Sequence, residues 1–356
     1  MHSIETRSSP SVFQIAATYI GTVIGAGFAS GQEVLQFFSA YGLKGMLGIL
    51  LSTILFFWLG YTILLIGGSL QAKSYMEIIQ FTNGKKLGSV INFFITIFLF
   101  GTIASMIAGA GAIFKEQFHL SPLWGTLFMA LLTVLTVVSG TKGVVKSISF
   151  VVPFLMISVL FISSYTILKN PLSLEEIQMA SSLKGVAPNW FIASLNYASY
   201  NLIIAITVLG PMGAEASNRK VIFRGALLGG FGLGIGVAAI YFSILTSIGT
   251  VAKIEIPMMM ISSQISPFFH FLFAIALFVG IYTTAVSALY GFVSRMHFIP
   301  SDYRVWMIVQ TTILAFLVSL IGFSNIVKYL YPFVGYCGLF FFGGLVYTWF
   351  TKRKML

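Results

Sequence analysis

The residues best suited to chemistry lie in the first apolar stretch, where four glycines fall within eleven positions, at 21, 25, 27 and 31. Each glycine costs a helix about 1 kcal/mol relative to alanine, so a continuous helix is disfavoured here. A hydroxyl, an amide and a carboxyl group follow, at Ser30, Gln32 and Glu33. Where a helix stops and resumes, its free amides suit a carboxylate and its free carbonyls suit a cation or ammonium group. The pattern predicts a broken helix with a solute site formed by Gly25, Ala26, Gly27 and Ser30.

A glycine-rich helix packed closely on its neighbours is the alternative interpretation, because small residues let membrane helices approach each other. Close packing accounts for Gly21 and Gly25, one turn apart, but poorly for Gln32 and Glu33. Glu33 is the one acidic residue that we place inside an apolar stretch, where an unpaired charge is costly. It is interpreted as a proton-coupling group, a group that attracts cations or part of an outer gate. Otherwise the span ends earlier and Glu33 lies in water at the outer mouth.

Two later stretches also carry polar groups in apolar surroundings. Residues 196–201 read Asn-Tyr-Ala-Ser-Tyr-Asn, and we expect Tyr197, Ser199 and Asn201 to join the solute site. Thr283 and Thr284 follow Gly280 by three and four positions, which places them on one face of a helix. Hard oxygen ligands of this kind suit a small alkali cation. The alternative is that the two hydroxyls bond back to their own helix.

The composition identifies the kind of protein that must position these residues. Of 356 residues, 58% are hydrophobic and 8% are charged, whereas about 25% of an ordinary globular protein is charged. The chain is therefore expected to be an all-α polytopic membrane protein. Its net charge of +11 does not indicate nucleic-acid binding, because the basic residues fall between apolar stretches and are typical of topology signals.

Ten apolar segments can be distinguished, and we expect each to cross the bilayer. With the N terminus inside, fourteen of the twenty Lys and Arg residues lie on the cytoplasmic side, which predicts that both termini are cytoplasmic. The segments cover residues 11–38, 43–69, 89–114, 122–139, 144–168, 189–212, 221–249, 267–293, 304–323 and 326–350.

Short similarities suggest that the ten segments form two related sets of five. The pattern aromatic-Ala-Ser-x-amide occurs at 28–32 and at 197–201, and Pro-Phe occurs at 153–154 and 332–333. Each pair lies five segments apart, and because five is odd the second set would be inverted. We therefore predict a first repeat at 1–168, an extracytoplasmic linker at 169–187 and a second repeat at 188–356, with breaks in spans one and six. Chance similarity in a chain rich in Phe, Ala and Ser is the alternative.

Ten spans, an inverted repeat and the Gly-x-Gly-aromatic break at 25–28 resemble the amino acid–polyamine–organocation transporters with the LeuT-type fold. Residues 21–38 resemble, more narrowly, bacterial membrane proteins of the YkvI type. In sodium-coupled members of the superfamily, hydroxyls and a carbonyl on span eight bind sodium together with two carbonyls before the break in span one. The resemblance implies an ion site formed by Gly21, Ile24, Gly280, Thr283 and Thr284.

The coupling ion, Na⁺ or H⁺, stays open. Some proton-coupled relatives place a lysine from span five where sodium would bind. Here the candidates are Lys142 and Lys146, which lie at the cytoplasmic start of that span and fit positive-inside anchors equally well.

Enzyme activity is not expected, because the sequence offers one deep carboxylate, Glu33, and no deep histidine or second acid beside it. The four histidines are not clustered and the single cysteine, Cys337, lies in an apolar span, so neither a metal centre nor a cofactor is expected.

The expected function is secondary active transport of a small solute, an amino acid or related amine, by alternating access in symport with Na⁺ or H⁺. The resemblance also implies an alternative, since relatives of this fold act as nutrient-receptor subunits in spore germination. The expected location is the bacterial plasma membrane, and the expected partners are the solute and the lipid bilayer.

Overall fold

The computed structural model describes residues 9–139, 142–216, 218–296 and 303–352, and for residues 26 and 142–152 it describes the backbone alone. Helices make up nearly all of these residues, and no strand occurs among them. The first crossing consists of α1 (Val12–Val23), α2 (Ala26–Ser30) and α3 (Gln32–Phe37), and the next four are α4 (Lys44–Leu70), α5 (Tyr75–Phe118), α6 (Pro122–Ser139) and α7 (Lys142–Lys169).

The second set of crossings consists of α9 (Trp190–Glu215), α10 (Arg219–Leu245), α13 (Pro267–Ser294), α14 (Arg304–Ser319) and α15 (Phe323–Lys352). Connections contain the short helices η1 (Ser39–Tyr41), α8 (Leu174–Ser181), α11 (Ile248–Val251) and α12 (Pro257–Ser263). Seven described helices are long and apolar enough to cross a membrane by themselves, and α1, residues 153–169 of α7 and α14 are shorter apolar helices. Each of the ten predicted apolar segments thus coincides with one crossing.

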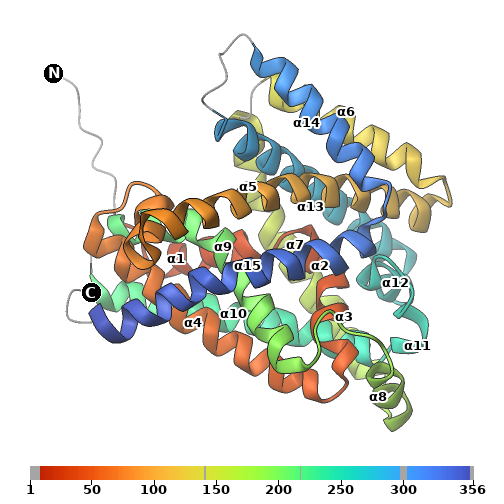
Figure 1. Cartoon of the computed structure of the whole chain (residues 1–356). Coiled ribbons are helices and arrows are strands. Elements are labelled where there is room, and N and C mark those ends of the chain that lie inside the picture. The colour runs from red at the N-terminus through yellow and green to blue at the C-terminus, as the bar shows by residue number, and fades with distance from the viewer. Residues whose placement is uncertain (1–8, 140–141, 217, 297–302, 353–356) are drawn as a thin grey trace.

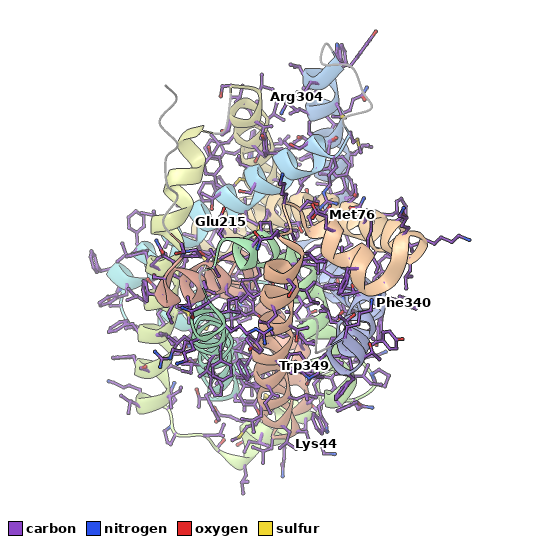
Figure 2. All side chains as sticks on the ribbon, turned by 90° about the vertical axis from the view of Figure 1, so that its left-hand side faces the viewer. Lys44, Met76, Glu215, Arg304, Phe340 and Trp349 are labelled. Carbon is purple, nitrogen blue, oxygen red and sulfur yellow. The ribbon has the colours of Figure 1, made fainter. Side chains whose placement is uncertain are left out.

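The helices form a bundle with two distinct ends (Figure 1). The start of α1 and the end of α15 lie at one end, on the left in Figure 1, which is called the inner end below. The helices α3, α8, α11 and α12 lie toward the opposite, outer end. Figure 2 looks at the inner end and shows Arg304, the first residue of α14, at the edge of the molecule. The helices α14 and α6 pack on each other away from the centre, so the remaining crossings surround the middle of the bundle.

The predicted break in the first crossing is confirmed. A capping box between Ser11 and Gln14 starts α1, which ends at Val23. Ile24 and Gly25 are extended, with ψ values of 91° and −174°, before α2 begins. Gly31 has a φ of 81°, a left-handed conformation that glycine adopts at low cost, and it separates α2 from α3. The chain is therefore interrupted twice within one crossing.

The predicted break in the sixth crossing is wrong, because α9 runs as one helix through residues 196–201. That stretch contains no glycine, and Asn196, Ser199 and Asn201 find partners without opening the backbone. Asn196 Nδ2 donates to the Pro332 carbonyl at 2.8 Å, and the Ser199 hydroxyl donates to the Gly335 carbonyl at 2.8 Å. Asn201 Nδ2 donates to the Tyr197 carbonyl, one turn earlier in the same helix, at 2.9 Å. The polar residues thus join α9 to α15 and stabilise the helix.

Close helix contact is the role of glycines outside the break. A Cβ at Gly67 of α4 would collide with the Gly210 carbonyl, and a Cβ at Gly213 of α9 would collide with the Leu64 carbonyl. Such close approach of backbones is the usual use of small residues in membrane helices. The first helix of the broken crossing, α1, packs between α9 and α10.

Candidate functional site

A cavity of about 380 Å³ lies beside the break in the first crossing. It extends along the bundle to Arg295 at the end of α13, whose guanidinium lies 5.0 Å from the ring of Tyr75 at the start of α5. The cavity thus reaches the inner end of the bundle. Its lining consists of residues 21–25, 27, 33, 95, 98, 99, 102, 106, 155, 200, 201, 203, 204, 207, 208, 280, 283, 284, 287, 288, 295 and 331.

The break leaves backbone oxygens free at this cavity. In a continuous helix the Gly25 amide would donate to the Gly21 carbonyl, but it donates instead to the Val23 carbonyl at 3.0 Å. The Gly21 carbonyl therefore loses its helical partner. The Ile24 amide still closes the last turn on Ile20 at 2.8 Å, so the Ile24 carbonyl belongs to the extended segment that follows.

Thr283 and Thr284 of α13 lie on the other side of the same cavity. Their hydroxyls donate to the Gly280 carbonyl at 3.0 and 2.8 Å, so they do bond back to their own helix. Each hydroxyl oxygen keeps lone pairs for a second partner. A Cβ placed on Gly25 would lie 4.0 Å from Thr284 Oγ1, which shows how closely α13 approaches the break. The structure brings all five residues of the predicted ion site to one cavity.

Glu33 lies at the opposite end of this cavity, in the first turn of α3. Its side chain is buried, with 6% exposed, so it does not lie in water at the outer mouth. The Tyr200 hydroxyl donates to Glu33 Oε2. The other carboxylate oxygen lies against the α carbon of Gly27, where a Cβ would collide with it. Gly27 is therefore needed to admit the Glu33 carboxylate.

Hydrogen bonds close the outer side of the site. The Gln32 side-chain amide is bonded to the Ser324 hydroxyl at 2.6 Å, and Gln36 Nε2 donates to the Ser324 carbonyl at 3.1 Å. Glu255 Oε2 accepts from the Ser324 amide at 3.4 Å and from its neighbour, Phe323, at 3.0 Å. These bonds tie α3 and the connection before α12 to the start of α15.

Glu116, near the end of α5, extends this network. Its Oε1 accepts from the amides of Glu255 and Ile256 at 2.9 and 3.3 Å. Lys115 Nζ lies 3.7 Å from Glu255 Oε1. Carboxylates are favourable beside the free amides at helix starts, which explains their place before α12 and α15. The sequence analysis missed both acids, although each is the nearest carboxylate to a predicted span end.

The predicted solute-site residues divide into two groups. Gly25, Gly27 and Asn201 line the cavity, whereas Ser30, Tyr197 and Ser199 do not. The Ser30 hydroxyl donates to the Gly27 carbonyl at 2.7 Å and so stabilises the short helix α2. Ala26 starts α2, and its side chain lies outside the described residues.

Tyr197 and Ser199 point away from the cavity because successive positions of a continuous α9 face different neighbours. Ser199 faces α15, as described above, and the Tyr197 ring packs against Phe38 with ring centroids 4.8 Å apart. Their neighbour Tyr200 faces the cavity, together with Phe98 of α5 and Tyr331 of α15, and the sequence analysis missed all three. The Tyr331 hydroxyl lies 3.4 Å from Ser105 Oγ.

Other predicted features can be placed as follows. The side chains of Lys142 and Lys146 lie outside the described residues. Within the part of the chain that the structure describes, no group of three or more His, Cys, Asp or Glu side chains could hold a metal ion. Cys337 is a half-buried free thiol on α15.

Known proteins with similar structures share this architecture. The inward-facing conformation of Mhp1 matches with a TM-score of 0.62 and 14% identity over 94% of this chain and 76% of that chain. MhsT in complex with L-phenylalanine matches with a TM-score of 0.62 and 15% identity over 94% of this chain and 90% of that chain. At these identities the likeness establishes the fold, which is the predicted LeuT type.

Sequence comparisons identify the family. A family model described as spore germination protein matches residues 11–171. The membrane protein YkvI of Bacillus subtilis, described as uncharacterized, is 33% identical over 354 residues, which cover 98% of this chain and 99% of YkvI. With a third of the residues shared over nearly the whole of both chains, this multi-pass membrane protein belongs to the YkvI family.

Proposed function

We propose that the chain is a secondary active transporter that binds a small solute at the break in its first crossing and exposes it to alternate sides of the membrane. The observation that carries this proposal is the cavity of about 380 Å³ beside residues 21–27. Pockets for small molecules have volumes of about 300–1,000 Å³, so an amino acid or related amine fits. A broken helix inside the membrane is stable where it lines such a cavity, because solute or water can satisfy the freed backbone groups.

Symport with sodium is supported by the free oxygens on both sides of the cavity. Gly21 and Ile24 supply carbonyls from the end of α1, and Gly280, Thr283 and Thr284 supply a carbonyl and two hydroxyls from α13. A cation held between these helices would fix the extended segment at residues 24–25. The solute binds to the same segment, so each ligand would favour the conformation that binds the other. Proton coupling through Glu33 is the alternative.

Alternating access requires that one end of the cavity is closed while the other is open. The outer end is closed by the bonds of Gln32 and Gln36 to Ser324, whereas the cavity continues to Arg295 at the inner end. Glu33 lies on α3 next to these outer bonds, so it can transmit occupancy of the site to the outer gate. Because Lys and Arg are in excess at the inner end, we place both termini in the cytoplasm of a bacterial cell. The cavity of the described conformation would then open toward the cytoplasm.

Counterflow in proteoliposomes tests the proposal. The purified chain would first be screened by thermal shift against amino acids and amines, with and without sodium. A labelled hit is then added outside vesicles loaded with the unlabelled compound. We expect label to accumulate above the level in protein-free vesicles, and to do so faster with sodium. Binding without accumulation would contradict transport.

A nutrient receptor is the second candidate function. It is favoured by the match of residues 11–171 to the family model described as spore germination protein. A receptor of this fold would use the same cavity to bind a solute but would not exchange it across the membrane. Saturable binding together with absent counterflow is the result expected of a receptor.

A further inference from the structure

No cationic side chain in the part of the chain that the structure describes is paired with the Glu33 carboxylate. It accepts from the Tyr200 hydroxyl and lies against the α carbon of Gly27, and no Lys, Arg or His of the described residues forms an ion pair with it. An ionised carboxylate that is 6% exposed is costly unless a positive charge compensates it. Because Glu33 lines the cavity, that positive charge can be supplied by a ligand.

Three aromatic rings pack on one another beside Glu33, and one of them, Tyr200, donates its hydroxyl to the carboxylate. Phe98, Tyr200 and Tyr331 come from three different helices, and all three line the cavity. Their ring centroids lie 6.1 Å apart for Phe98 and Tyr200, 5.6 Å for Phe98 and Tyr331 and 5.3 Å for Tyr200 and Tyr331. Ring faces attract cations, and a group of rings around one point is a common way to bind an ammonium group. The carboxylate and the rings thus favour the same kind of ligand.

Among the described residues that line the cavity, no cationic side chain that could bind a carboxylate lies beside Glu33. Of the described residues that line the cavity, Arg295 is the one cationic side chain. It lies fifteen residues beyond Gly280 on the same helix, a rise of about 22 Å. Its Nη1 also donates to Asn92 Oδ1 at 3.0 Å. The carboxylate of an α-amino acid lies next to its ammonium group, so it cannot reach Arg295 while the ammonium is at Glu33.

The remainder of the lining is mostly apolar. Ile95 and Leu99 of α5, Leu155 of α7, and Ile203, Ile204 and Val208 of α9 extend from the rings toward the inner end. A hydrocarbon or aromatic body would lose contact with water there, at a gain of about 25 cal/mol per Å² of apolar surface. Besides Tyr200, the described polar side chains that line the cavity on these helices are Thr102, Asn201 and Thr207, so a second polar group on the ligand would meet a hydroxyl or an amide there but no charge.

We propose that the solute is an organic amine with an apolar body and no carboxylate, whose ammonium group pairs with Glu33 beside the rings of Phe98, Tyr200 and Tyr331. This inference rests on the proposed solute site, and it narrows the solute class from amino acids and amines to amines. The Tyr200 hydroxyl orients the carboxylate by donating to Oε2.

Three probes that differ by one group test the inference. Phenethylamine, L-phenylalanine and 3-phenylpropionate share the phenyl ring and carry an ammonium, both charges or a carboxylate. Their binding to the purified full-length protein would be measured by thermal shift and calorimetry in detergent with sodium. We expect phenethylamine to bind at least tenfold more tightly than L-phenylalanine, and 3-phenylpropionate not to bind. Absence of phenethylamine binding, or preference for either carboxylate, overturns the inference; counterflow of an amino acid would still leave the transport proposal intact.

Substitutions of Glu33 and of one of the three aromatic rings give a second test. Glu33→Gln keeps the shape and the acceptor for Tyr200 but removes the charge, and it is expected to weaken phenethylamine binding by about thirtyfold or more. Phe98→Leu keeps the charge and removes one ring, with an expected loss of about three- to tenfold. Glu175→Gln on the exposed helix α8 is the matched control and should leave the affinity unchanged. Unchanged affinity for phenethylamine in a folded Glu33→Gln or Phe98→Leu protein overturns the proposed binding of the ammonium group by that residue.

Discussion

Removing the two hydroxyls of α13 should abolish stimulation by sodium. Thr283→Val and Thr284→Val replace each hydroxyl by a methyl group and keep the branched shape, so no large cavity is created. Both hydroxyls now donate only to the Gly280 carbonyl of their own helix, and valine needs no such partner. The change therefore removes oxygen ligands from the proposed ion site while the helix stays intact.

The size of the effect follows from the number of ligands lost. A polar contact to a charged partner contributes about 1.5–3 kcal/mol, and 1.4 kcal/mol corresponds to a factor of ten in affinity. One substitution should raise the sodium concentration for half-maximal stimulation about ten- to hundredfold. The double substitution removes two of the five proposed ligands, and its effect of about 10² or more would exceed the range of sodium that vesicles tolerate.

The assay is solute counterflow in proteoliposomes at increasing sodium, with sodium-dependent thermal shift as an independent reading of binding. Thr133→Val is the matched control, because Thr133 is buried like Thr283 and its hydroxyl donates to the carbonyl one turn earlier, at Met129, on the peripheral helix α6. We expect this control to behave as the parent protein. A double variant at 283 and 284 that keeps the parent's sodium dependence would refute the ion site and favour coupling to protons.

Three further substitutions test other parts of the site. Gly27→Ala should displace the Glu33 carboxylate and abolish solute binding in a protein that still folds, as measured by calorimetry beside far-UV circular dichroism. Glu255→Gln should weaken the bonds to the start of α15 and increase the labelling of Ser324→Cys by an impermeant thiol reagent. Gly213→Ala should overpack the contact of α9 with α4, destabilise the protein by about 1–3 kcal/mol and lower the thermal midpoint in detergent. Unchanged solute binding would contradict the role of Gly27, unchanged labelling that of Glu255, and an unchanged thermal midpoint that of Gly213.

The crossings and the first break could be predicted because their signals are local. Apolar length identifies a span, and the glycines at 25 and 27, followed by Glu33, indicate a helix that stops in front of polar groups. These features need no partner elsewhere in the chain. The structure confirms the ten crossings and the break at Ile24 and Gly25 for this reason.

The distant partners could not be predicted. The polar residues of α9 suggested a second break, but Asn196 and Ser199 find carbonyl partners on α15, 136 residues away in each case. Glu116 likewise bonds to amides 139 and 140 positions along the chain. A polar group in an apolar helix has the same sequence signal whether it binds a solute or a neighbouring helix, so only the packing separates the two roles.

If the chain transports its solute by alternating access as proposed, the packing indicates how it would change state. Under the predicted repeat, α15 on α9 corresponds to α7 on α1, yet α15 packs along α9 whereas α7 contacts α1 at few points. The close pair is joined through Asn196 and Ser199, and Gly335 and Gly338 leave room for them. On the open side Leu155 of α7 lines the cavity. An exchange of these two packings would close the inner end and open the outer one, so a cycle of transport would have to break the bonds of Asn196 and Ser199 once in each turnover.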